Sequence, residues 1–175
     1  MQATSELFQS DWLIWVDAGL SRHVDHFGNL PWPNVRALSE LQPTSIYVNS
    51  WDGYGDAKDA WSVWCKNPRA SFQENRNLLS GTVIFSSKEA LLRVLPLWTA
   101  VFEKMAQLKT PWNNEQVVFS LLGCTYPDLV GVFDKRSVAA LWLEMHNNHS
   151  VDVVRVPEEE SSQTAMCEPW VTLEN

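Results

Sequence analysis

Five short runs of apolar or alternating side chains predict the β-strands of this chain. The first run, residues 12–16 (WLIWV), is apolar throughout, which is typical of a strand covered on both faces. Four later runs, at residues 45–51, 78–86, 129–134 and 151–156, are rich in β-branched and aromatic residues. Together these runs predict one sheet of about five strands.

Helical spacing of apolar residues is clearest between the third and the fourth predicted strand. Residues 88–108 carry Leu, Trp, Phe and Met side chains at positions that fall on one side of a helix. Ser86 or Ser87 is expected to cap this helix, and Pro96 predicts a kink or a break because proline removes a backbone donor. A short amphipathic helix is also expected at residues 34–41.

The order of these elements predicts an α/β fold. We expect a mixed, mainly parallel sheet with helices on both faces. A chain of 175 residues can bury a sizeable core in one domain but is short for two. The predicted domain covers residues 1–156, and the proline and the three glutamates that follow predict a mobile acidic tail over residues 157–175.

Composition narrows the range of partners. A formal net charge of -8, without a stretch rich in Lys or Arg, argues against a nucleic-acid partner. The sequence shows neither a run of about 18 apolar residues nor the features of a signal peptide, so we expect no transmembrane segment and see no signal against a cytoplasmic location. Ten tryptophans are many for this length, and their flat rings suit either core packing or stacking on sugars.

The three cysteines are widely spaced and odd in number. Cys65, Cys124 and Cys167 form no CxxC pair, which makes a zinc knuckle or a disulfide scaffold an unfavourable interpretation. We therefore expect reduced, buried thiols.

A carboxylate directly follows the first predicted strand. Asp17 ends the apolar run, and Gly19 would allow a sharp turn or the close approach of a ligand. Ligands of open α/β sheets bind in the crevice at the carboxyl ends of the strands. Asp17 is therefore a candidate binding residue, although an aspartate that only accepts hydrogen bonds from the next turn would look the same in sequence.

Further polar candidates follow along the chain. They are Ser80, Gly81, Trp112, Asn114, Glu115, Gln116, His146 and His149. Asn114 and Glu115 open a helix predicted at residues 117–122, where capping and the helix dipole already explain them. Neither effect explains Gln116.

The order of these features resembles the catalytic half of GT-A-type glycosyltransferases. The segments WVDAGLSRH, LSGTVIFSS and NNEQVVFSLL look most like HtrL/YibB-type glycosyltransferases and are more distantly similar to the glycogenin and galactosyltransferase-like group. The resemblance covers residues 11–149. It implies a GT-A-like fold and a transfer of sugar from a nucleotide-sugar donor to a glycan or other acceptor, assisted by Mn²⁺ or Mg²⁺.

The resemblance also implies roles for individual residues. Asp17 would be the metal or nucleotide carboxylate, His146 or His149 a late metal ligand, and Glu115 the catalytic residue near the sugar. The implied substrate contacts are Gly19, Ser80, Gly81, Trp112, Asn114 and Gln116. This chemistry requires such residues because a hard divalent ion takes oxygen ligands and neutralises the diphosphate, while a carboxylate near the sugar can act as a general base.

Two departures from the family pattern leave other functions open. Gly19 stands where a DxD motif has its second carboxylate, and little sequence precedes the first strand where the family has a nucleotide-binding βαβ region. One alternative is a non-catalytic carbohydrate-binding or interaction module derived from the same fold. Another is a metal-dependent hydrolase that uses Asp17 with Asp52 or the histidines. Binding of a nucleoside diphosphate would distinguish the transferase from the carbohydrate-binding module.

Overall fold

The computed structural model describes residues 10–17, 38–50, 65, 79–107, 115–133 and 153–154. At residues 50, 80–82 and 154 only the backbone is described. The predicted tail at residues 157–175 lies outside these ranges, as does much of the predicted domain. The prediction of one domain over residues 1–156 therefore stays a prediction.

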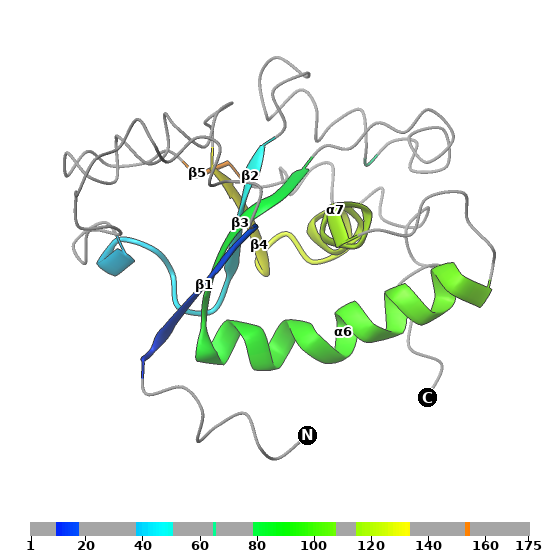
Figure 1. Cartoon of the computed structure of the whole chain (residues 1–175), viewed down its shortest axis with the longest axis horizontal. Coiled ribbons are helices and arrows are strands. Elements are labelled where there is room, and N and C mark those ends of the chain that lie inside the picture. The colour runs from blue at the N-terminus through cyan, green and yellow to red at the C-terminus, as the bar shows by residue number, and fades with distance from the viewer. Residues whose placement is uncertain are drawn as a thin grey trace.

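The predicted strands all appear, together with two long helices (Figure 1). The elements are β1 (Trp12–Val16), β2 (Ile46–Ser50), β3 (Leu79–Ser87), α6 (Lys88–Gln107), α7 (Glu115–Thr125), β4 (Val130–Phe133) and β5 (Val153–Val154). Four of these strands match the predicted runs within one or two residues, while β5 is much shorter than its run. The α/β class and the five strands are therefore confirmed.

The sheet has the order β1-β3-β2-β4-β5, and its pairing corrects one prediction. The β2–β4 pair is parallel, whereas the β1–β3, β2–β3 and β4–β5 pairs are antiparallel. The sheet is mixed, as expected, but it is not mainly parallel. The reason is that β3 lies between β1 and β2 and runs against both, and β5 runs against β4, so that β2 and β4 are the one parallel pair among the described strands.

Helices α6 and α7 both pack on one face of the sheet (Figure 1). Alternation along β2 directs Ile46 and Val48 to this side, where they join one buried cluster with Val94 of α6 and Leu121 of α7. Helix α6 continues through Pro96, so the predicted break does not occur. The carbonyl of Leu92 has no helical donor, because proline lacks an N–H group. Leu92 and Pro96 are both exposed, which lets water reach this carbonyl.

The opposite face carries a cluster of aromatic side chains. The ring of Tyr47 stacks on Phe133 with centroids 5.6 Å apart, and Phe85 meets Phe133 edge-on at 5.4 Å. Leu38 and Leu41 are buried against this cluster, and residues 38–39 are helical, in agreement with the short helix predicted there. The described residues thus place helical segments on both faces, as expected, but the two long helices share one face.

Gly131 makes this aromatic packing possible. A Cβ atom at position 131 would lie 2.7 Å from two ring carbons of Tyr47 and 2.9 Å from the Cγ1 atom of Val153. The Tyr47 hydroxyl accepts a hydrogen bond from the backbone N–H of Gln42 at 2.7 Å, which helps to hold the ring over the glycine. The aromatic face therefore depends on the absence of a side chain at this position.

Ser87 is the residue that caps α6. Its Oγ atom accepts a hydrogen bond from the N–H of Ala90 at 2.9 Å, and its hydroxyl donates to the carbonyl of Pro43. Of the two candidates from the sequence, Ser87 is thus the cap, and Ser86 instead donates to the carbonyl of Ser87 at 2.8 Å. The capping interaction fixes the start of the helix directly at the end of β3.

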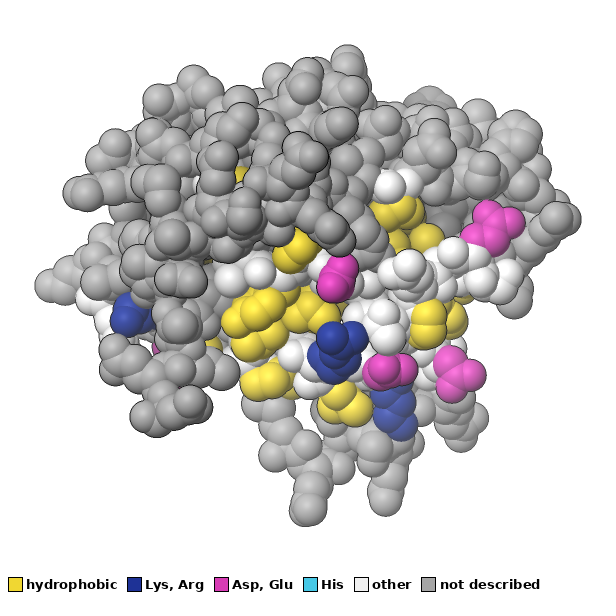
Figure 2. Space-filling view, turned by 180° about the vertical axis from the view of Figure 1, so that it is seen from behind, with side chains coloured by type: hydrophobic (Ala, Val, Ile, Leu, Met, Phe, Trp, Pro, Cys, Tyr) yellow, Lys and Arg dark blue, Asp and Glu magenta, His cyan; other side chains and the backbone are white. Residues whose placement is uncertain are grey.

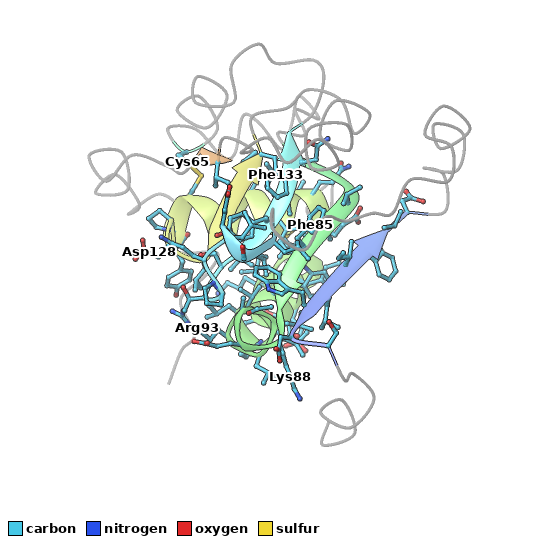
Figure 3. The ribbon with its side chains drawn as sticks, turned by 90° about the vertical axis from the view of Figure 1, so that its left-hand side faces the viewer. Cys65, Phe85, Lys88, Arg93, Asp128 and Phe133 are labelled. Carbon is cyan, nitrogen blue, oxygen red and sulfur yellow. A yellow bond between two sulfur atoms is a disulfide. The ribbon has the colours of Figure 1, made fainter. Side chains whose placement is uncertain are left out.

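Cys65 and Cys124 form a disulfide, which corrects the prediction of reduced thiols (Figure 3). The two Cα atoms are 5.4 Å apart, and both residues are buried in the same cluster as the helices. The sequence hid this pair because 59 residues separate the two cysteines and no spacing motif marks them. The pair fixes residue 65 to the C-terminal half of α7.

Candidate functional site

Three strands of the sheet end at the same edge. Because β3 runs against β1 and β2, and β4 runs parallel to β2, the carboxyl ends of β1, β2 and β4 lie beside the amino end of β3. Asp17 follows β1 at this edge, and Asn49 lies close to the end of β2. The basic residues Lys88 and Arg93 of α6 lie at the other end of the sheet (Figure 3). We refer to the first end as the carboxyl edge.

The predicted pocket residues Ser80 and Gly81 lie at this carboxyl edge. Val16 pairs with Val83, so Asp17 follows β1 at a point close to Gly81 along β3. Ser80 pairs with Asn49 on the other neighbour of β3. The structure thus brings Asp17, Ser80 and Gly81 together at one end of the sheet, although they are more than 60 residues apart in sequence.

The ladder between β2 and β3 is interrupted at this edge. Val48 pairs with Ile84, but the next residue, Asn49, pairs with Ser80. Residues 81–83 of β3 therefore face no residue of β2. Such bulges redirect strands and side chains, and they occur often beside binding sites.

Asp17 is an exposed carboxylate that can supply one ligand to a metal ion. No group of three or more His, Cys, Asp or Glu side chains that could together hold a metal ion occurs within the described part of the chain. Mg²⁺ can be held by only one or two carboxylates when water and phosphate oxygens take its other positions, so the chemistry of Asp17 is compatible with such an ion. Gly19, His146 and His149 lie outside the described residues, and their predicted roles are open.

Glu115 and Gln116 begin α7, as predicted, on the face of the sheet that the helices cover. The Glu115 side chain is exposed at the first helical turn, where its charge complements the positive end of the helix. Gln116 is half-buried, and its backbone carbonyl accepts a hydrogen bond from the Ser120 hydroxyl at 2.8 Å. Trp112 and Asn114 lie outside the described residues.

A second feature, an apolar groove, lies between the edge strand β1 and helix α6. Its volume is about 540 Å³, within the range usual for ligand pockets. Leu13 and Trp15 of β1 form one wall, while Leu91, Leu95 and Trp98 of α6 form another. Ser86 contributes a polar group to the lining, but its hydroxyl already donates to the carbonyl of Ser87. The described walls therefore suit an apolar surface rather than a charged group.

Trp15 is the most exposed large hydrophobic residue among those described. Its side chain is 65% exposed at the rim of the groove, two residues before Asp17. From the sequence, Trp15 was predicted only to be part of a buried strand. Trp15 is exposed because β1 is an edge strand, and the composition of a strand does not show whether it lies at the edge or in the centre of a sheet.

Asn49, at the carboxyl edge, was also not among the site residues predicted from the sequence. It is 2% exposed, and its Oδ1 atom has no hydrogen-bond partner. A polar amide after the run Ile46-Tyr47-Val48 was the available signal, since asparagine is disfavoured in buried strands.

The described surface shows no extended area of one charge on the face seen in Figure 2. Acidic and basic side chains lie next to one another there, among hydrophobic ones. No described helix combines the length and the apolar character needed to cross a bilayer. Comparison of the chain with protein-family models, curated proteins and solved structures found no match.

Proposed function

We propose that this chain is a glycosyltransferase-like protein that uses a nucleotide-sugar donor. The observation that supports the proposal is the arrangement at the carboxyl edge. The residues that the sequence resemblance assigns to the metal carboxylate (Asp17) and to the pocket wall (Ser80 and Gly81) come from separate segments. Asp17 directly follows β1 there, and Ser80 and Gly81 lie on the neighbouring strand β3. Crevices at the carboxyl ends of strands are where α/β sheets bind ligands.

In the proposed reaction, the acceptor hydroxyl attacks the anomeric carbon of the donor sugar. The bond between this carbon and the phosphate oxygen breaks, and the nucleoside diphosphate leaves with the bonding electron pair. A divalent ion, when bound, would neutralise charge on the diphosphate. Asp17 would hold that ion, and Glu115 would accept the hydroxyl proton or orient the sugar.

The decisive experiment is calorimetric titration with UDP, with and without Mn²⁺. We expect metal-dependent binding by the wild type, and loss of that binding in Asp17→Asn. Asp11→Asn is the matched control, because Asp11 is also exposed but lies at the opposite end of β1. No binding of UDP by the folded wild type would refute the use of this nucleotide donor. Equal binding by Asp17→Asn and Asp11→Asn would refute the role of Asp17.

A second candidate function is carbohydrate binding without catalysis, and the exposure of Trp15 favours it. A tryptophan ring offers a flat apolar face on which sugars stack, and the groove extends the apolar surface next to it. We expect that Trp15→Ala would abolish binding to a glycan array, whereas Leu92→Ala, which removes a 58% exposed residue of α6, would not. Glycan binding without UDP binding would support this second function over the first.

A further inference from the structure

The buried polar side chains of the described residues are almost all satisfied within the protein. The Ser45 hydroxyl donates to the carbonyl of Asp128 at 2.6 Å, the Ser120 hydroxyl to that of Gln116 at 2.8 Å, and Tyr47 bonds the backbone of Gln42. Among the described residues, the Oδ1 atom of Asn49 is the exception. Native proteins rarely leave a buried acceptor without a donor, so each such atom calls for a physical explanation.

Asn49 occupies a position where an apolar residue would be expected. It follows Ile46, Tyr47 and Val48 in β2 and pairs with Phe133 on the parallel neighbour β4. Burial of an amide oxygen without a partner is unfavourable because the oxygen loses its bond to water and gains none in return. Packing in the sheet therefore does not account for the Oδ1 atom of Asn49.

The surroundings of Asn49 differ from those of the rest of β2. The bulge in β3 begins at this residue, so that residues 81–83 leave the regular ladder directly beside it. Asn49 is paired with Ser80 and lies at the carboxyl edge, where Asp17 follows the end of β1. The unpartnered oxygen and the irregular backbone thus coincide at the end of the sheet where we propose that the donor binds.

We infer that Asn49 is a ligand-binding residue whose Oδ1 atom accepts a hydrogen bond from a hydroxyl group of the bound sugar; the identity of the ligand rests on the proposed function. An acceptor requires a group that carries a hydrogen. Phosphate oxygens that are ionised at neutral pH cannot supply one, whereas sugar hydroxyls can. The ionised diphosphate is therefore excluded as the partner of Asn49. Of the remaining donor groups, we assign the hydroxyls of the transferred sugar rather than those of the ribose, and an equal loss of UDP binding in Asn49→Val would overturn this assignment.

The first test is the stability of the ligand-free protein. We expect Asn49→Val to melt at or above the temperature of the wild type, because valine suits a buried strand and removes the unpartnered oxygen. Asn49→Ala is the second variant in case valine does not fit. Tyr47→Phe is the matched control, since it removes a buried hydroxyl that has partners, and it should melt below the wild type. The inference would be overturned if the melting temperatures of both Asn49 variants fell as far as that of Tyr47→Phe. Such a fall would show that a structural partner, such as a buried water, satisfies Oδ1.

The second test compares UDP-glucose and UDP-galactose with UDP, each in the presence of Mn²⁺. We expect Asn49→Val to bind a nucleotide sugar about tenfold more weakly than the wild type while binding UDP equally well, as loss of one hydrogen bond predicts. Unchanged binding of both nucleotide sugars would overturn the inference and leave the proposed function standing. If the folded wild type binds neither UDP nor the nucleotide sugars, the proposed function fails, and the melting temperatures alone decide whether Asn49 is kept for a ligand.

Discussion

The disulfide between Cys65 and Cys124 yields the sharpest test of the fold. We predict that its removal, by reduction or in the double variant Cys65→Ala/Cys124→Ala, lowers the free energy of unfolding substantially. The bond closes a loop across 59 residues of sequence, and that loop contains β3, α6 and most of α7. Without the bond, the unfolded chain gains conformational entropy, whereas the folded chain gains almost none, so the folded state becomes less stable.

The size of the effect follows from the length of this loop. Closing a loop of this length in the unfolded chain corresponds to about 4 kcal/mol when the entropy of the chain is the dominant contribution. A single domain is stable by only about 5–15 kcal/mol in total, so the loss would be a large part of the whole. In a domain of this size it would lower the melting temperature by about 10 °C.

Two measurements check this prediction. Alkylation in denaturant without reductant should modify at most one of the three cysteines, whereas alkylation after reduction should modify all three. Urea unfolding, with and without reductant, measures the difference in the free energy of unfolding. The protein is refolded under each condition first, because burial slows reduction of the native bond. Cys167→Ala, which leaves the pair intact, is the control. Three adducts without reductant, or a loss below about 1 kcal/mol, would refute the reasoning.

Three further substitutions test the packing around the sheet. Gly131→Ala should lower the free energy of unfolding by about 1–3 kcal/mol, since a methyl group would collide with the Tyr47 ring. An unchanged urea midpoint would contradict this packing. Ser87→Ala should lower the free energy of unfolding by about 1–2 kcal/mol in the same assay because it removes the cap of α6, while Glu89→Gln should have little effect. Equal losses would instead support Ser86 as the cap, because Glu89 lies three residues after Ser86, which is the spacing of a capping box. Pro96→Ala should raise the melting temperature, with a gain of up to about 3 kcal/mol, and a decrease would show that the proline suits its place in α6.

The sequence was sufficient to predict the elements but not how they pair. Strands such as residues 12–16 and 45–51 carry their own signal in β-branched and aromatic residues, and the helix after β3 shows helical periodicity over five turns. Pairing instead depends on contacts between distant segments. Nothing local to β3 reveals that it inserts between β1 and β2, and a fully apolar β1 predicted a central strand where the structure has an edge strand.

The same distinction explains what could be predicted of the site. The prediction grouped Asp17, Ser80 and Gly81 through the resemblance to glycosyltransferases and not through any predicted pairing of strands. In a parallel pair, Ser80 and Gly81 at the amino end of β3 would lie away from Asp17. They lie near it because β3 is antiparallel to β1 and β2, so its amino end lies beside their carboxyl ends. Trp15 and Asn49 were not selected because exposure and hydrogen bonding are properties of the assembled sheet. A carboxylate at a strand end can be found from sequence, whereas an acceptor without a donor can be found only after every other donor has been placed.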